Sequence, residues 1–246
     1  MGKIFDFETV LTSIPRLLVY LPMTLEITIL SMLLGLLLGL LIAIVKMNKI
    51  PVLSQIFAVF VSFVRGTPLI VQLYLSYNGI PLLLKYYNYN NGTDFNINNI
   101  PSLLFVLVTF AVNEGAYNSE NIRGALQSVN KGQIEAAQSL WMTYPQVLAR
   151  VIIPEAFVVA LPTLGNTLIG LLKGTSLAFV CAVVEMTAQA KIIAGANYRY
   201  FEVYLALAVI YWGVTIMVEQ LIQFVEKKIS IPDNVQLRAR KAGDWL

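Results

Sequence analysis

Apolar residues recur along the chain in five long stretches that are separated by shorter polar segments. The stretches cover about residues 24–45, 51–84, 101–121, 154–172 and 200–225. A helix needs about 20 predominantly apolar residues to cross the hydrocarbon core of a bilayer, so each stretch is long enough for a crossing. The pattern therefore predicts an all-α membrane protein with about five transmembrane helices.

Two parts of this pattern predict irregular helices. The stretch 51–84 is too long for one straight crossing, and Arg65-Gly66-Thr67-Pro68 interrupts it. Because proline removes a backbone donor and clashes with the preceding turn, we expect a broken helix there. Residues 175–198, around Gly195, are expected to form one or two short, partly re-entrant helices.

The N-terminal segment has a different pattern. Apolar residues at positions 7, 10, 11, 14, 17, 18 and 21 follow helical spacing, while polar residues lie off that stripe. We expect residues 1–22 to form an amphipathic helix that lies in the membrane interface and ends at Pro22. A single transmembrane domain should then cover residues 23–230, followed by a short cytoplasmic tail over residues 231–246.

Composition supports a multi-pass membrane protein and limits its chemistry. Of 246 residues, 57% are hydrophobic and 13% are charged, which is too apolar for the surface of a water-soluble protein. A net charge of +3 is too small to indicate a nucleic-acid partner. The absence of histidine excludes His-based catalysis and most zinc sites, and one cysteine permits no internal disulfide. We therefore predict no catalytic residue and no metal site.

Basic residues are distributed unevenly among the polar segments. If the loops after the first and third spans and the C-terminus are cytoplasmic, more Lys and Arg lie inside than outside. The positive-inside rule then favours an N-terminus outside and a C-terminus inside. This orientation places the polar segment 131–154 in the cytoplasm.

The segment 131–154 has the pattern of a docking loop for another protein. It should form two short helices joined at a turn near Met142-Thr143-Tyr144-Pro145. Ile134, Ala137, Leu140 and Trp141 share one helical face. Apolar groups that gather outside the membrane usually pack against a partner.

This segment resembles the EAA coupling loop of bacterial ABC importer permeases, with Glu135-Ala136-Ala137 at its start and Val151-Ile152-Ile153-Pro154 at its end. The family glycine that follows EAA is Trp141 in this chain. The resemblance implies that a separate ATPase contacts Glu135, Ala136, Ala137, Leu140, Trp141 and Pro154. Since the chain has no G-x-x-x-x-G-K-[S/T] loop, ATP and Mg²⁺ would bind that partner, and this chain would need no cofactor.

The interruption at Arg65 is the second candidate site. An arginine within an apolar stretch is costly unless it faces protein, water or an anion. Gly66 and Pro68 would begin a new half-helix, whose positive dipole end can hold a carboxylate. The run from Arg65 to Gln72 resembles the R-G-T-P-x-x-x-Q motif of the polar amino acid branch of these permeases. The alternative is a proline kink with an arginine that reaches the membrane interface.

The third and fourth spans contribute further polar residues. Asn113, Glu114, Tyr117 and Glu120 can share one helical face, in a run similar to the family pattern N-x-x-A-Y-x-x-E-x-x-R-G. For Glu120, an ion pair with Arg123 is equally open. The fourth span carries a run similar to the family's L-P-x-L-G-N. The predicted substrate pathway comprises Arg65, Gly66, Thr67, Gln72, Asn113, Glu114, Tyr117, Glu120, Asn166 and Thr167.

Two departures from the family bear on the substrate. Relatives that take basic amino acids tend to carry an acidic residue where this chain has Thr167, and an aspartate is common where it has Gly174. Fewer carboxylates disfavour a basic side chain and favour a polar, net-neutral amino acid, such as cystine or glutamine, with cystine preferred. Glutamine or basic amino acids are the alternatives.

The resemblance also implies partners and a location. We expect two ABC ATPase subunits, a second permease subunit (identical or related), an extracytoplasmic solute-binding protein and the lipid of a bacterial plasma membrane. The rival interpretation is an ion-coupled secondary transporter that uses Glu114 or Glu120 as its ion site. Few spans and no detectable inverted repeat disfavour that rival.

Overall fold

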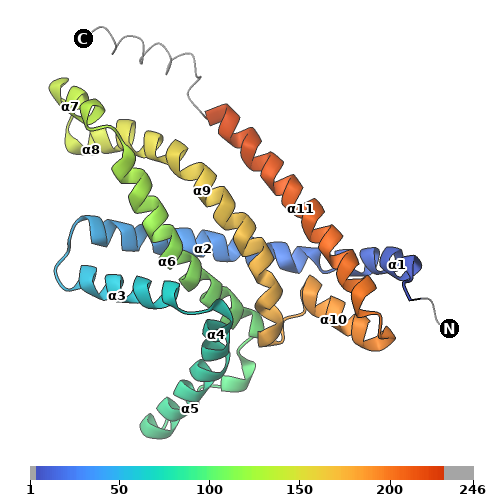
Figure 1. Cartoon of the computed structure of the whole chain (residues 1–246). Coiled ribbons are helices and arrows are strands. Elements are labelled where there is room, and N and C mark those ends of the chain that lie inside the picture. Colours follow the sequence, from blue (N-terminus) through green and yellow to red (C-terminus); the bar gives the residue numbers. More distant parts are fainter. Residues whose placement is uncertain (1–3, 230–246) are drawn as a thin grey trace.

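The computed structural model describes residues 4–229, with the side chain of Asn98 excluded, and every regular element among them is helical (Figure 1). The predicted all-α class is therefore confirmed. The tail predicted for residues 231–246 lies outside the described residues. The helices are α1 (Phe7–Leu18), α2 (Leu21–Met47), α3 (Leu53–Gly66), α4 (Leu69–Tyr74), α5 (Ile80–Asn91), α6 (Ser102–Ser128), α7 (Lys131–Ser139), α8 (Tyr144–Val147), α9 (Ile153–Gly174), α10 (Met186–Asn197) and α11 (Tyr200–Ile229).

Wider and tighter turns join several of these helices. Leu75–Gly79 and Leu148–Ile152 are π-helical, and Ile97–Asn99 and Thr175–Cys181 are 3₁₀ helices. The short helices predicted for residues 175–198 are the 3₁₀ turn and α10. Between them, the fully buried Glu185 caps α10, because its carboxylate accepts hydrogen bonds from the backbone N–H groups of Thr187 and Ala188, both at 2.9 Å.

Membrane-spanning helices account for most of the described chain. Leu21–Met47, Tyr144–Cys181 and Tyr200–Ile229 are long and apolar enough to cross a bilayer. The bent pair Leu53–Gly66 and Leu69–Asn91 adds a fourth crossing if it is counted as one span. Helix α6 has 27 residues, as α2 does. Amides and carboxylates interrupt its apolar sequence, so α6 is less hydrophobic than the three helical stretches named above. It is the third of the five predicted spans.

The broken helix is found where the sequence predicts it. The axes of α3 and the α4–α5 stretch differ by 109°, and Thr67 and Pro68 between them are extended. Figure 1 shows α4 and α5 turning away from α3.

The second short helix predicted for the segment 131–154 is not separate. Helix α8 continues through the π-turn at Leu148–Ile152 into α9, so Tyr144–Cys181 form one continuous helical stretch of 38 residues. Pro154 lies in the first turn of α9 and ends no helix. The wide turn accommodates a residue that lacks a backbone N–H, because its hydrogen bonds follow a different spacing. The prediction that a span starts only after Pro154 was therefore wrong.

Small residues bring α2 and α6 into close contact. A Cβ atom added at Gly35 would lie 2.6 Å from the Cβ of Glu114, and one at Gly39 would lie 3.0 Å from the backbone N of Ser119. On α6, a Cβ at Gly115 would lie 2.7 Å from Leu38 Cδ2. Two glycines four residues apart form the small-residue contact that is typical of membrane helix pairs. This crossing fixes the backbone position of Glu114.

The amphipathic helix α1 packs against α10 and α11. Its Val10 and Leu17 are buried in a cluster with residues of both helices, and Figure 1 shows α1 beside the start of α11. The backbone N–H of Asp6 also donates to the Glu202 carboxylate at 3.2 Å. The helix is present as predicted, and its place in the membrane interface stays a prediction.

Candidate functional site: two hollows and a coupling loop

Gln72 holds the break between α3 and α4. Its side-chain nitrogen lies 2.8 Å from the Val64 carbonyl oxygen, 3.1 Å from the Thr67 carbonyl oxygen and 2.9 Å from Thr67 Oγ1. Its side-chain oxygen accepts a hydrogen bond from Asn113 Nδ2 at 3.1 Å. Hydrogen bonds therefore join three predicted pathway residues, Thr67, Gln72 and Asn113, and these bonds stabilise the bend between α3 and α4.

A first hollow, of about 510 Å³, lies between α6 and α9. We call it the Glu114 hollow. Five of the ten predicted pathway residues line it, namely Asn113, Glu114, Tyr117, Asn166 and Thr167. Its other lining residues are Leu69, Phe110, Asn121, Thr163, Gly170, Leu171 and Gly174.

Among the described residues that line this hollow, Glu114 alone is charged. Its side chain is 8% exposed, and its Oε2 has no hydrogen-bond partner within the described part of the chain. A buried carboxylate oxygen without a partner is unfavourable, so a cationic or hydrogen-bonding ligand would be stabilised there. On the facing helix, Thr167 Oγ1 lies 3.4 Å from Asn121 Nδ2 and donates to the Thr163 carbonyl at 2.9 Å.

A second hollow, of about 480 Å³, contains Arg65. We call it the Arg65 hollow, and its lining residues are Lys46, Ala58, Val61, Ser62, Arg65, Gly66, Tyr117 and Glu120. The Arg65 guanidinium lies over the ring of Tyr117, 5.2 Å from its centroid, in cation–π geometry. The structure thus separates Arg65, Gly66 and Glu120 from the residues around Glu114.

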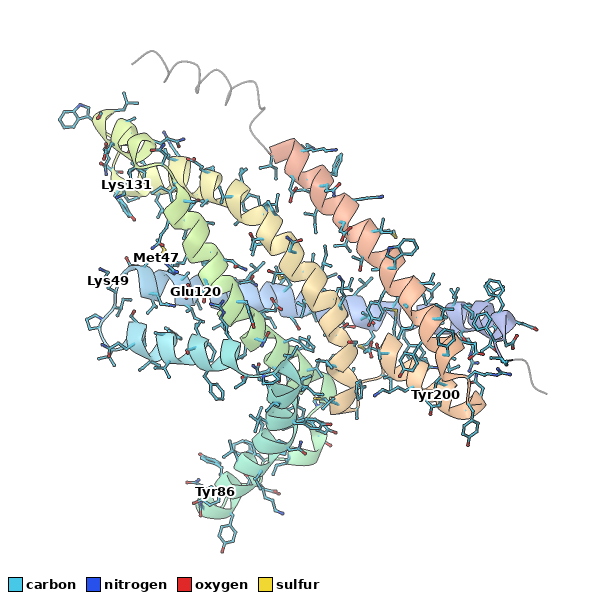
Figure 2. All side chains as sticks on the ribbon, viewed as in Figure 1. Met47, Lys49, Tyr86, Glu120, Lys131 and Tyr200 are labelled. Carbon is cyan, nitrogen blue, oxygen red and sulfur yellow. The ribbon has the colours of Figure 1, made fainter. Side chains whose placement is uncertain are left out.

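Glu120 is held by two cations. Its carboxylate pairs with Lys46 of α2 and accepts hydrogen bonds from Arg123 Nη2 at 2.7 Å and Nε at 2.9 Å. Figure 2 shows Glu120 on α6 near the end of α2 that Met47 marks. The Arg123 pair is the alternative that the sequence offered for Glu120. Lys46 was missed, because only the crossing of α2 with α6 brings it to this carboxylate.

The coupling loop buries part of its apolar face within the chain itself. Ala137 is buried, and Ile134 packs with it against a cluster that includes Val147 and Ile152. Asn130 caps the start of α7 by accepting a hydrogen bond from the Gly132 N–H at 2.8 Å. The loop is therefore a folded unit, and its remaining predicted contact residues, Glu135, Ala136, Leu140, Trp141 and Pro154, are exposed.

Trp141 occupies a position that favours glycine. Its φ is +60°, and its N–H donates to the Gln138 carbonyl at 2.9 Å, while the Met142 N–H donates to the Ala137 carbonyl at 3.3 Å. These two bonds form a Schellman motif, whose left-handed residue is usually glycine. The geometry explains the family glycine at this position, and here it leaves an indole that is 94% exposed.

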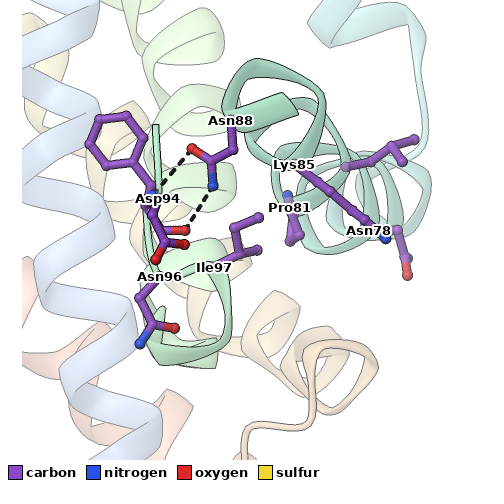
Figure 3. Close-up of a pocket in the computed structure, with 9 residues that line it drawn as sticks. Asn78, Pro81, Lys85, Asn88, Asp94, Asn96 and Ile97 are labelled. Atoms are coloured by element: carbon purple, nitrogen blue, oxygen red, sulfur yellow. Dashed lines mark hydrogen bonds between the residues drawn. The ribbon is translucent and has the colours of Figure 1, made fainter. Parts of the chain in front are cut away.

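A third and larger hollow, of about 710 Å³, lies beside α5 (Figure 3). Lys85 and Asp94 are its charged lining residues. Asn88 shapes it, because its side-chain amide exchanges hydrogen bonds with the backbone of Phe95 at 3.0 and 3.2 Å. None of the predicted pathway residues lines this hollow. The sequence signal for this hollow was the Asn- and Tyr-rich composition of the segment after the second span. Composition alone does not show that residues 94–97 fold back against α5.

Comparison with known proteins agrees with this architecture. Residues 35–231 match the family described as "Binding-protein-dependent transport system inner membrane component". The chain therefore belongs to this family of membrane transport components. More narrowly, it is an amino acid permease subunit of the ABC type, as the resemblance of its coupling loop and R-G-T-P motif predicted.

Two relatives and one solved structure show how far the similarity extends. The chain is 40% identical over 227 residues to the probable amino-acid permease protein YxeN of Bacillus subtilis, covering 92% of this chain and 97% of that protein. It is 36% identical over 229 residues to the L-cystine transport system permease protein TcyL of the same organism, covering 93% of each. A solved structure described as an amino acid ABC transporter with histidines shares 37% identity and a TM-score of 0.78, covering 92% of this chain and 100% of that chain.

Proposed function

We propose that this permease subunit translocates a polar, net-neutral amino acid such as cystine, and that the Glu114 hollow binds the ammonium group of that solute. The charge of the hollow carries this assignment. Glu114 is its one charged lining residue, and the unpartnered Oε2 offers an acceptor to an ammonium group. The amides and hydroxyls of Asn113, Asn166 and Thr167 suit a polar side chain without net charge.

The neutral lining also bears on the alternatives. A basic amino acid would bring a second cation into a hollow that holds a single carboxylate, because Thr167 and Gly174 are uncharged. The relative TcyL, named for L-cystine, supports a net-neutral solute, whereas the solved amino acid ABC transporter is described with histidines. Glutamine and basic amino acids therefore belong in the same experiment as cystine.

Two ABC ATPase subunits would bind the exposed face of the coupling loop, at Glu135, Ala136, Leu140 and Trp141. Those subunits would hold ATP and Mg²⁺, so this chain needs no cofactor of its own. A second permease subunit, identical or related, would complete the pathway, and an extracytoplasmic solute-binding protein would deliver the solute. An ATPase that binds the inward- and outward-facing states with different affinity biases the equilibrium between them.

The substrate is tested with the permease and its ATPase reconstituted in proteoliposomes. L-cystine, L-glutamine, L-arginine and L-histidine are compared for stimulated ATP hydrolysis and for uptake. We expect cystine to be most effective. Preferential stimulation by arginine would overturn the net-neutral assignment, and accumulation without ATP would favour the secondary transporter.

The role of Glu114 is tested by Glu114→Gln, with Glu219→Gln as the matched control because Glu219 is exposed on α11. A hydrogen bond to a charged group contributes about 1.5–3 kcal/mol, so Glu114→Gln should weaken the apparent affinity at least about tenfold. Equal affinity in the two variants would remove Glu114 from the site. The coupling loop is tested separately by Glu135→Lys, which should lower copurification of the ATPase while the permease still inserts into the membrane.

A further inference from the structure

Tyr117 lines both the Glu114 hollow and the Arg65 hollow. It is half-exposed, at 40%, although it lies in the middle of α6 among buried neighbours. An aromatic ring that is shared by two hollows is a wall between them. Its position is held on one side by the cation–π contact with Arg65.

The two hollows meet at Tyr117 on α6 and overlap along that helix. Glu114, Tyr117 and Glu120 are spaced three residues apart, so each lies about 4.5 Å further along the helix axis than the one before. Helix α6 ends at Ser128, and the coupling loop begins with α7 at Lys131. On α6 the Arg65 hollow includes Tyr117 and Glu120, toward the coupling loop, whereas the Glu114 hollow extends from Phe110 to Asn121 on the side of α6 that faces α9.

The hollows also differ in their ionisable side chains. Glu114 is the acidic residue of the first hollow. The second is lined by two cations, Lys46 and Arg65, and one carboxylate, Glu120. That carboxylate is already neutralised by Lys46 and Arg123. Arg65 forms no ion pair within the described residues, so its charge is available to an anion.

We propose that the Arg65 hollow is a second binding site, specific for a carboxylate, and that Tyr117 is the partition between the two sites. The inference rests on the proposed function, since the carboxylate is that of the translocated amino acid. The solute would first place its ammonium group at Glu114 and, after the ring has turned, its carboxylate at Arg65.

The partition is coupled to occupancy by competition for Arg65. A guanidinium binds a carboxylate through two parallel, charge-assisted hydrogen bonds, which are stronger than its contact with an exposed aromatic ring. A carboxylate that reaches Arg65 would therefore displace Tyr117 from the guanidinium. When the solute leaves, the cation–π contact between Arg65 and Tyr117 would form again, and the ring would again separate the two hollows.

The charge of each site can be measured without knowing the solute. In a Cys181→Ala background, Ser62→Cys introduces a thiol into the Arg65 hollow, and Thr163→Cys introduces one into the Glu114 hollow. Rates of modification by sulfonate and trimethylammonium methanethiosulfonates are measured in the assembled complex and normalised to free thiol. Local potential should favour the sulfonate reagent at Ser62→Cys and the ammonium reagent at Thr163→Cys, each by about threefold or more.

Arg65→Gln should abolish the sulfonate preference at Ser62→Cys and leave the preference at Thr163→Cys unchanged. The same reagent preference at both positions, or a sulfonate preference that survives Arg65→Gln, would overturn the carboxylate site. This outcome does not depend on which amino acid is transported. It is therefore separate from any failure of the proposed substrate.

The partition is tested by passive flux of labelled L-cystine and L-glutamine across proteoliposomes in the absence of ATP. Tyr117→Ala should raise the leak above that of the original protein, because the ring is removed and the hollows join. Tyr117→Phe should restore most of the seal, and Tyr86→Ala, an exposed tyrosine of α5, is the control for a lost surface ring (Figure 2). If Tyr117→Ala fails to assemble, Tyr117→Leu replaces it. A well-assembled variant that leaks no more than the original protein would overturn the partition.

Discussion

Replacing Gly35 with alanine probes the crossing of α2 and α6 that positions Glu114. The added Cβ would lie 2.6 Å from the Cβ of Glu114 and 3.3 Å from the Ala111 carbonyl oxygen. Carbon atoms pack best at about 3.5–4.0 Å, so the first contact is about 1 Å too short. Both atoms are attached directly to their backbones, and no rotamer change can relieve the contact. The helices themselves must move apart.

The magnitude follows from two opposing effects. Overpacking of a well-packed contact costs about 1–3 kcal/mol. Alanine in place of glycine within a helix gains at most about 1 kcal/mol. We therefore expect Gly35→Ala to lower the free energy of unfolding by about 1 kcal/mol. Gly213 of α11 is the control, because a Cβ there meets nothing within 4 Å, and Gly213→Ala should be neutral or stabilising by up to about 1 kcal/mol.

The measurement is reversible unfolding of the purified permease by sodium dodecyl sulfate in mixed micelles, followed by circular dichroism. The two variants should differ by about 2 kcal/mol in opposite directions around the original protein. Because separation of the helices also moves Glu114, Gly35→Ala should weaken amino acid stimulation of the ATPase, whereas Gly213→Ala should not. Equal stability of the two variants would refute the close contact as the determinant of this crossing.

Three further substitutions test other parts of the structure. Gln72→Leu removes the acceptor of the Asn113 amide and the hydrogen bond to the Val64 carbonyl across the helix break, so the free energy of unfolding should fall by about 1–3 kcal/mol. An unchanged free energy of unfolding would mean that the bend does not depend on Gln72. Trp141→Gly should stabilise the isolated permease by about 1 kcal/mol, because glycine adopts positive φ without strain. The same substitution should reduce copurification of the ATPase, and undiminished copurification would show that the indole is not part of the docking surface. Thr167→Asp adds a second carboxylate to the Glu114 hollow and should shift competition from cystine toward arginine by about tenfold, and an unchanged ratio would exclude Thr167 from selectivity.

Local patterns in the sequence predicted the helices well. The bend at Thr67 and Pro68, the turn near Met142 and the start of α11 at Tyr200 all follow from residues that are close together in the chain. Proline placement and apolar periodicity act over a few residues, so they can be read without knowledge of the tertiary structure. Pro154 is the exception. It was predicted to precede the start of a span, but the π-turn just before it lets the helix continue through this proline.

Contacts between distant segments could not be predicted in the same way. The sequence placed Arg65 and Glu114 in one substrate region, and only the packing of α3 against α6 shows that Tyr117 stands between their hollows. Lys46 appeared as one of several basic residues, although it holds Glu120 from another helix. A usable signal was present at Gly35 and Gly39, whose spacing is typical of closely packed membrane helices. Their partner helix was still unknown.

The continuity of α8 with α9 has a mechanical consequence. The α-helical part, α9, has 22 residues and is about 33 Å long, so it acts as a lever whose two ends move together. It carries Thr163, Asn166 and Thr167, and the π-turn at Leu148–Ile152 joins it to α8. A small tilt of α9 as a whole would move those side chains through the same angle without any relay through intermediate contacts. The π-turn at Leu148–Ile152 is where such a lever would flex, because its hydrogen bonds already depart from the regular spacing.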